Sequence, residues 1–157
     1  MDNSGLLAMG AGMLIFSLAI MVFLIITMWK IFTKAGQPGW AIFIPIYNLY
    51  VYTQVIRRPN WWILVYIGIM GLYYAGFAMI MSGSGAGAAL TAVGGIALLV
   101  ISIMDTHRLS TSFGQGAGFT VGLVLLGIIF YPILAFGNYH YVGGAAVSIG
   151  GPIDQNL

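Results

Sequence analysis

Four long apolar runs that contain no charged residue constrain this chain more than any other feature of its sequence. They cover residues 6–29, 61–81, 88–104 and 119–136. About 20 consecutive apolar residues are enough for an α-helix to cross the hydrocarbon core of a bilayer. A helix is the expected form because it satisfies its own backbone hydrogen bonds in lipid. We therefore predict an all-α membrane protein with four transmembrane helices.

The composition argues against a soluble globular domain. Hydrophobic residues make up 61% of the 157 residues and charged residues only 5%, whereas about 25% of an ordinary globular domain is charged. The chain has no cysteine, which excludes disulfides, thiolate metal sites and cysteine nucleophiles. We expect one transmembrane bundle over residues 1–137 and a glycine-rich apolar tail over residues 138–157. Such a tail is a poor helix former, so we expect it to dock on the bundle or on a partner.

A short helix over residues 45–58 is predicted to lie along the membrane surface, or to dip into the membrane and return. Pro45 suits the first position of a helix, and Pro59 disfavours helical geometry at the residue before it. A helix of these roughly 14 residues rises about 21 Å, which is shorter than a hydrocarbon core of about 30 Å. The segment is also amphipathic, with a polar face that carries Tyr47, Tyr50, Thr53, Gln54, Arg57 and Arg58.

The placement of charge supports this topology. If residues 45–58 do not cross, all five basic residues lie on one side, and Asp2 and Asp154 lie on the other. The positive-inside rule then makes the basic side cytoplasmic and puts both termini outside the cytoplasm. The basic residues could bind anionic lipid headgroups or serve orientation alone, and both interpretations stay open for Lys30, Lys34, Arg57, Arg58 and Arg108.

Small residues suggest how the helices pack. Pairs four residues apart let backbones approach closely in lipid, and they occur at Gly71 and Ala75, at Gly87, Thr91 and Gly95, and at Gly118 and Gly122. Two glycine-rich segments, AGQPGW at 35–40 and FGQGAGF at 113–119, also resemble each other. Inverted repeats are typical of transporters, but the prolines that follow these segments stand at different spacings. We interpret the segments as two turns on the same side of the membrane.

The four predicted spans contain no ionisable residue that would mark a proton relay or an ion pathway. Asp105, His107 and Arg108 form a cluster, which we interpret as a helix end because cations are favoured at a helix C-terminus. His140 lies between two tyrosines and is interpreted as an interfacial anchor rather than a metal ligand. We therefore predict no catalytic site, no metal site and no cofactor.

Three polar residues are predicted to have structural roles. Asn48 lies on the apolar face of the short helix, where an unpaired amide is costly, so we expect it to bond irregular backbone near Pro45. Tyr73 and Tyr74 lie halfway along the second span. Buried tyrosine hydroxyls need partners, and we expect a hydrogen bond between helices, with a polar path as the alternative.

Four motifs follow one another between Trp29 and Tyr141. They read W-K-I-F-x-K-A-G-Q-P-G-W-A-x-x-I-P-I-Y-N, R-P-x-W-W, S-F-G-x-G-x-G-F-x-x-G-L and I-F-Y-P-I-L-A-F-G-N-Y-x-Y. In this order they resemble a family of small bacterial membrane proteins that is known only as a domain of unknown function. The resemblance implies a multi-pass protein of the bacterial inner membrane, and it carries no catalytic or binding residues.

These features favour a non-enzymatic membrane subunit or scaffold. It is expected to contact membrane lipids and to pack against other membrane proteins or against itself, with no nucleic-acid partner. The alternative is a small oligomeric channel or carrier for a weakly polar solute, with residues 40–48 lining the path.

Overall fold

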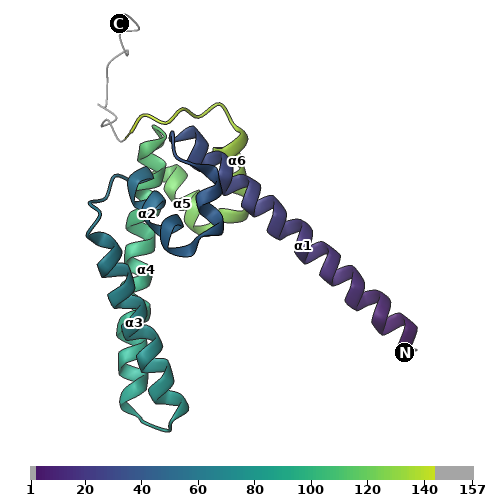
Figure 1. Ribbon diagram of the computed structural model, residues 1–157, viewed down its shortest axis with the longest axis vertical. Coiled ribbons are helices and arrows are strands. Elements are labelled where there is room, and N and C mark those ends of the chain that lie inside the picture. Colours follow the sequence, from purple (N-terminus) through teal and green to yellow (C-terminus); the bar gives the residue numbers. More distant parts are fainter. Residues whose placement is uncertain (1–2, 144–157) are drawn as a thin grey trace, which may run out of the picture.

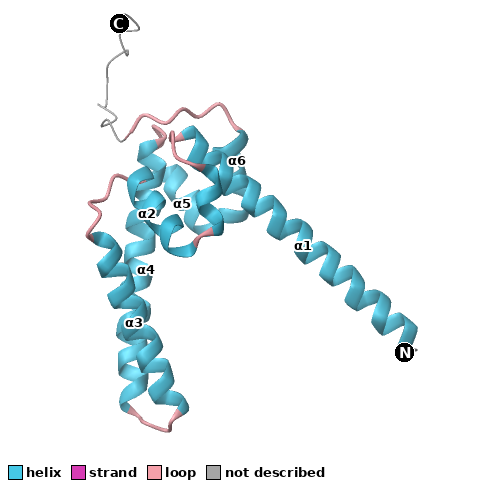
Figure 2. Ribbon diagram, viewed as in Figure 1, coloured by secondary structure: helices cyan, strands magenta, loops and turns pink. Residues whose placement is uncertain are grey.

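The structure is a computed structural model that describes residues 3–143, and Figures 1 and 2 show its helices. They are α1 (Asn3–Lys34), the 3-10 helix η1 (Gly39–Phe43), α2 (Pro45–Val55), α3 (Trp62–Met81), α4 (Ala86–Ser112), α5 (Ala117–Leu125) and α6 (Gly127–Phe136). No strand occurs among residues 3–143, which confirms the predicted all-α class. The predicted tail from residue 144 onward lies outside the described residues, as do Asp2 and Asp154.

The helices form a head and two arms (Figure 1). The head contains the C-terminal ends of α1 and α4 together with η1, α2, α5 and α6. The single-helix arm is the part of α1 before Thr27. The hairpin arm is α3 with the part of α4 before Asp105. Both arms leave the same side of the head and diverge, so that the N-terminus lies far from the α3–α4 turn.

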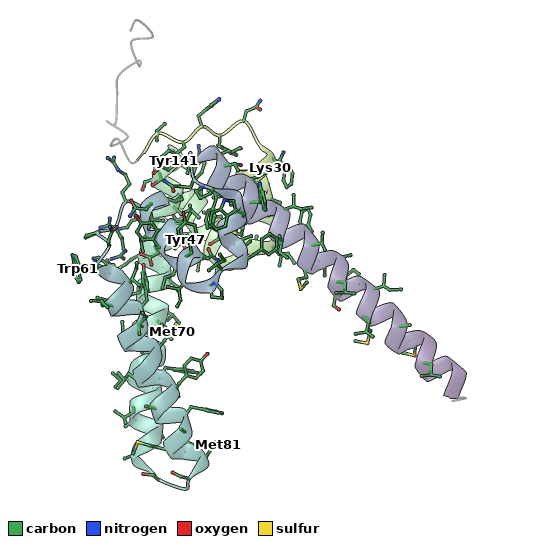
Figure 3. The ribbon with its side chains drawn as sticks, viewed as in Figure 1. Lys30, Tyr47, Trp61, Met70, Met81 and Tyr141 are labelled. Atoms are coloured by element: carbon green, nitrogen blue, oxygen red, sulfur yellow. The ribbon has the colours of Figure 1, made fainter. Side chains whose placement is uncertain are left out.

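The buried core lies in the head. Its side chains are each at most 2% exposed and come from α1, η1, α2, α4, α6 and the residues just after α2 and α4: Ile31, Phe32, Ala41, Val51, Val55, Ile56, Leu109, Phe113, Leu134 and Ala135. Fully burying one large apolar side chain contributes about 1.5–3 kcal/mol relative to leaving it in water. The apolar side chains of the arms project outward instead (Figure 3).

Within residues 3–143, three helical segments are long and apolar enough to cross a membrane. They are Met9–Lys34, Trp62–Met81 and Ala86–Ser112. The first three predicted spans are therefore membrane-compatible helices. The third predicted span corresponds to α4, which continues past its predicted end at residue 104 to Ser112. Asp105 is therefore buried within a helix and does not end one.

The structure does not confirm the fourth predicted span, residues 119–136. This segment forms two short helices, α5 and α6, that meet at Leu126 and fold back on each other. The ring centroids of Phe119 and Phe130 are 5.2 Å apart, whereas a straight helix would separate residues at this spacing by about 16 Å. A Cβ on Gly122 would lie 2.3 Å from Cε1 of Phe130. The missing side chain at Gly122 therefore makes room for this ring.

The short helix α2 begins at Pro45 as predicted and ends at Val55, after 11 residues. It is not among the segments that are long enough to cross a membrane. Its face differs from the prediction, because Thr53 is buried rather than part of an exposed polar face. The Thr53 hydroxyl donates to the Tyr50 carbonyl at 2.7 Å, so its polar group is satisfied within the helix.

The two glycine-rich segments form matching turns at the same end of the head. Gly36 ends α1 with a φ of 71°, and Gly114 ends α4 with a φ of 70°, a conformation that glycine adopts without a steric penalty. In each turn the following glutamine N–H bonds back to a carbonyl of the helix, at 2.8 Å for Gln37 and 2.9 Å for Gln115. Each turn leads into a pair of short helices. The two segments are thus turns of the same type at the same end of the head, and their side of the membrane stays a prediction.

Glycines also set the packing of the hairpin arm. A Cβ on Gly76 would lie 2.5 Å from the Thr91 nitrogen, and one on Gly94 would lie 2.9 Å from Cα of Tyr73. The two helices therefore touch backbone to backbone, as expected for helices in lipid. Of the predicted small-residue pairs, Gly87 and Thr91 lie in this contact, whereas a Cβ on Gly71 would meet only open space.

Candidate functional site

A buried ion pair joins Arg58, which follows α2, to Asp105 of α4. Nε of Arg58 lies 2.5 Å from Oδ1 of Asp105, and the two side chains are only 1% and 5% exposed. The second carboxylate oxygen of Asp105 accepts a hydrogen bond from the Tyr66 hydroxyl of α3. Asp105 is thus charge-balanced and holds the base of the hairpin arm to the head.

A left-handed residue directs Arg58 into this site. Arg57 has a φ of 53°, and the next N–H, that of Arg58, bonds to the Thr53 carbonyl at 2.8 Å. A residue other than glycine pays about 1–2 kcal/mol for this conformation. The turn separates the two neighbouring arginines, since Arg57 is exposed while Arg58 is 4% exposed.

The Arg58 guanidinium is held on two sides but is not fully satisfied. Its Cζ lies 3.6 Å from the centroid of the Trp62 ring, a cation–π contact that is strengthened by the burial of Arg58. Its Nη2 has no hydrogen-bond partner among the described residues. A buried pair adds little net stability, but removing one partner costs about 3–5 kcal/mol because the other charge is left uncompensated.

Two cavities lie where the arms meet the head. One of about 240 Å³ is lined by Asp105 and Tyr66 together with Tyr52, Leu98, Ile101, Ser102, Thr106 and Tyr131. The other, of about 320 Å³, is lined by Leu24, Thr27, Met28, Tyr52 and Tyr131. Burial raises the pKa of Tyr52 well above its ordinary value. Its hydroxyl therefore stays protonated and can donate a hydrogen bond into either cavity.

The other predicted anchoring residues divide into two groups. Nζ of Lys34 donates to the carbonyls of Leu134 and Gly137 at 2.9 and 2.6 Å, so it caps the C-terminal end of α6. Nζ of Lys30 lies 4.5 Å from the centroid of the Phe136 ring. These two lysines tie α1 to α6. Arg57 and Arg108 are exposed, whereas Arg58, which was grouped with them as a headgroup-binding or anchoring residue, is buried in the ion pair.

The three predicted polar residues lie in different surroundings. Asn48 is half-buried near the start of α2, which has no side-chain cap. Tyr73 joins α3 to α4 through close contact with Gly94, and Tyr74 is 61% exposed. Nδ1 of His107 lies 3.0 Å from the Thr120 hydroxyl and links α4 to α5.

The pairing of Arg58 with Asp105 and the role of Tyr66 were not predicted from the sequence. One signal pointed to it. Asp105 is the only acidic residue between Asp2 and Asp154, and an acid so near apolar spans needs a cationic partner. Five basic residues were available, and the sequence did not show which of them is the partner.

The comparisons with known proteins identify a family but no activity. No curated protein and no solved structure matches this chain. Residues 40–144, more than half of the chain, match a family of unknown function, DUF5684. The matched residues include the ion pair, the three cavity tyrosines and helices α2 to α6, while α1 precedes them. The predicted resemblance to an uncharacterised family is therefore confirmed, and the chain belongs to the family of unknown function DUF5684.

Proposed function

We propose that this protein is a non-enzymatic membrane subunit or scaffold whose arms bind the transmembrane helices of partner proteins. The observation that carries the proposal is the exposure of α1. None of the residues in the most apolar 18-residue window of its membrane-compatible segment is buried. The part of α1 before Thr27 makes few contacts within its own chain, so most of its lateral surface is available for lipid or for other helices.

Open glycines favour helices over lipid as the occupant. A Cβ on Gly10 or Gly12 of the single-helix arm, or on Gly68 or Gly71 of α3, would meet nothing within 4 Å. Apolar surface alone does not drive association in lipid, and small residues do so by letting backbones come close. The hairpin arm uses Gly76, Gly87 and Gly94 in this way internally. The open glycines offer the same type of contact to another chain.

The proposed location is the bacterial inner membrane, with α1, α3 and α4 crossing it and the basic head at the cytoplasmic side. The expectation that both termini lie outside the cytoplasm depended on a fourth span. Since α5 and α6 fold back, residue 143 lies beside the head, where Arg57 donates to its carbonyl. In this topology the N-terminal end of α1 is outside the cytoplasm and residue 143 is at the cytoplasmic side.

A small oligomeric channel or carrier is the second candidate. It is favoured by the two cavities that share Tyr52 and Tyr131 and lie between apolar arms. The hydroxyls of Tyr52 and Tyr131 are available to hydrogen-bond a weakly polar solute. This function requires several copies of the chain around a common path.

Isolation from the native membrane in mild detergent separates the two candidates. We expect a second membrane protein to co-purify at fixed stoichiometry, and we expect Gly12→Leu or Gly71→Leu to release it, because both side chains would enter open space in the isolated chain. Gly36→Leu is a control for general damage, since it strains a left-handed turn away from the arms. A pure homo-oligomer that carries solute into liposomes would overturn the scaffold proposal.

A further inference from the structure

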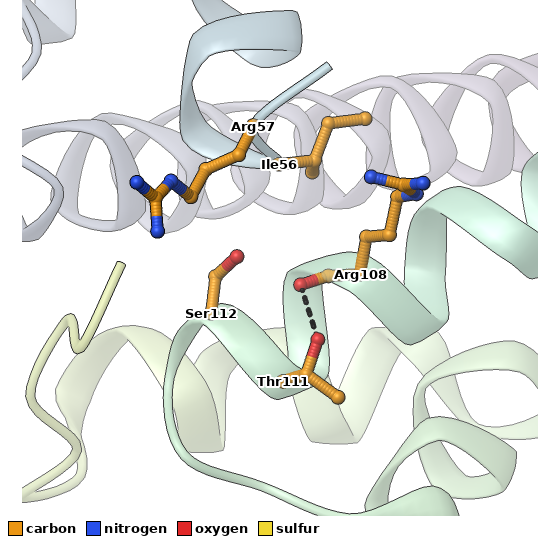
Figure 4. Close-up of a pocket in the computed structure, with 5 residues that line it drawn as sticks. All are labelled: Ile56, Arg57, Arg108, Thr111 and Ser112. Atoms are coloured by element: carbon orange, nitrogen blue, oxygen red, sulfur yellow. Dashed lines mark hydrogen bonds between the residues drawn. The ribbon is translucent and has the colours of Figure 1, made fainter. Parts of the chain in front are cut away.

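A basic pocket lies on the head, between the end of α2 and the end of α4 (Figure 4). Its volume is about 340 Å³, and it is lined by Ile56, Arg57, Arg108, Thr111 and Ser112. Figure 4 shows Arg57 and Arg108 on opposite sides of the pocket, with Ser112 between them. The pocket is separate from the two cavities between the arms.

The charge of this pocket is not neutralised by the protein. Asp105 is the only acidic residue within residues 3–143, and Arg58 is already paired with it. Arg57 and Arg108 therefore have no carboxylate partner in the described part of the chain. Arg57 uses one nitrogen, Nη1, to donate to the Gly143 carbonyl, and its other donors are left available.

The helix ends account for only part of this positive charge. α2 and α4 both terminate beside the pocket, and each C-terminus carries about −0.5 elementary charge. Two arginines bring two positive charges, so a net charge of about +1 is left. The last carbonyls of these helices also accept backbone N–H groups in the turns that follow. Capping the helices thus does not explain why two arginines meet here.

The hydroxyls point to the chemistry of the ligand. Ser112 is 2% exposed and lines the pocket, where its side chain lies between the two arginines (Figure 4). The Thr111 hydroxyl donates to the Arg108 carbonyl at 3.0 Å and retains a lone pair. Guanidinium groups bind phosphate oxygens through paired N–H donors, and a serine hydroxyl can donate to a further oxygen.

We propose that this pocket binds a phosphate group, with Arg57 and Arg108 neutralising the charge and the Ser112 hydroxyl donating to a phosphate oxygen. The phosphate belongs either to an anionic lipid headgroup or to a small soluble phosphate compound. The pocket lies at the head end of α4, one of the membrane-compatible helices, which is where a headgroup would reach it. The proposal does not depend on partner binding by the arms.

Native mass spectrometry of the full chain tests whether the phosphate belongs to a lipid headgroup. The chain is purified in mild detergent and mixed with equal amounts of phosphatidylglycerol and phosphatidylcholine. We expect preferential retention of phosphatidylglycerol, which Arg108→Gln or Arg57→Gln/Arg108→Gln reduces by about ten-fold or more, the loss of one or two charged hydrogen bonds. Arg108 is an exposed residue within a regular helix, so its substitution leaves the fold intact.

Lys30→Gln is the matched control, because Lys30 is exposed and basic but lies on Phe136 outside the pocket. Its retention of phosphatidylglycerol is expected to match that of the wild type. In a second experiment, inorganic phosphate is titrated into lipid-free protein and the unfolding temperature is followed. A saturable rise that is lost in Arg108→Gln supports the site with a soluble phosphate as the source. The proposal would be overturned if Lys30→Gln and Arg108→Gln reduced phosphatidylglycerol retention equally. It would also be overturned if the wild type neither preferred phosphatidylglycerol nor rose in unfolding temperature with phosphate.

Discussion

The two arms of this molecule are built from similar apolar helices, yet they are fixed to the head in different ways. The hairpin arm has backbone contacts through Gly76 and Gly94 and is joined to the head by the buried pair of Arg58 and Asp105. The single-helix arm extends from the head without burial along its apolar window. In lipid, hydrophobicity does not choose between these states, and small residues and buried polar bonds decide. The hairpin arm has one face of each helix paired within the chain, whereas the single-helix arm is left with no buried residue along its apolar window.

Removing the buried charge pair is expected to have the largest effect on this difference. Asp105→Asn leaves Arg58 buried without a counter-charge and is expected to lower the free energy of unfolding by about 3–5 kcal/mol. Tryptophan fluorescence, to which Trp62 beside Arg58 contributes, follows unfolding in detergent. The double substitution Arg58→Met/Asp105→Leu removes both charges and should recover much of the loss. A cost below about 1 kcal/mol for the single substitution would show that the pair does not hold the arm.

Two glycines of the same helix sharpen the comparison within α3. Gly76→Leu forces a side chain against the backbone of α4, and we expect a loss of about 1–3 kcal/mol or more. Gly71→Leu enters open space and should change the stability of the isolated chain by no more than about 0.5 kcal/mol. Thermal unfolding followed by circular dichroism measures both. Equal losses of stability in the two variants would contradict the finding that Gly76 of α3 faces α4 and Gly71 faces open space.

The attachment of the single-helix arm depends on Lys34. Lys34→Met removes two charged hydrogen bonds to α6, and because Lys34 is partly exposed we expect a loss of about 1–2 kcal/mol. Lys30→Met removes an exposed cation–π contact and should cost about 0.5–1 kcal/mol. Chemical unfolding of the two variants side by side gives the difference. If Lys30→Met proves the more costly, the capping of α6 is not what fixes this arm.

The smallest expected effect is at Arg57. Arg57→Gly relieves its left-handed backbone and is expected to raise the free energy of unfolding by about 0.5 kcal/mol, part of the relief being offset by greater freedom in the unfolded chain. Gly114→Ala introduces a side chain at a comparable φ and should lower stability by about 1 kcal/mol. Opposite signs in the two unfolding measurements are the expected result, and a shared sign would contradict the role of these turns.

Much of the fold follows from local sequence rules. The predicted spans 61–81 and 88–104 match α3 and most of α4, because each is a long apolar run without charge. The start of α2 at Pro45 followed from the geometry of proline. The reversal at Leu126 did not, since residues 119–136 are long and apolar enough for a span. It depends on the contact between Phe119 and Phe130, which hydropathy does not encode.

The site was less accessible from the sequence than the fold. The single central acid, Asp105, required a cation near it, but the choice of Arg58 over Arg57 depends on one left-handed residue. The cavity tyrosines come from α2, α3 and α6, and only the folded head brings them together. Residues that are joined by long-range packing give no periodic signal in one sequence.

Photo-crosslinking in the native membrane is the most direct test of the free surface of the single-helix arm. A photoreactive amino acid replaces Phe16, which is 68% exposed on α1, and mass spectrometry identifies the captured peptides. We expect adducts with a distinct membrane polypeptide, present in a fixed ratio to this chain. Adducts within the same chain, to peptides from α3 or α4, would show that the arms close on each other and would contradict an arm left free for a partner.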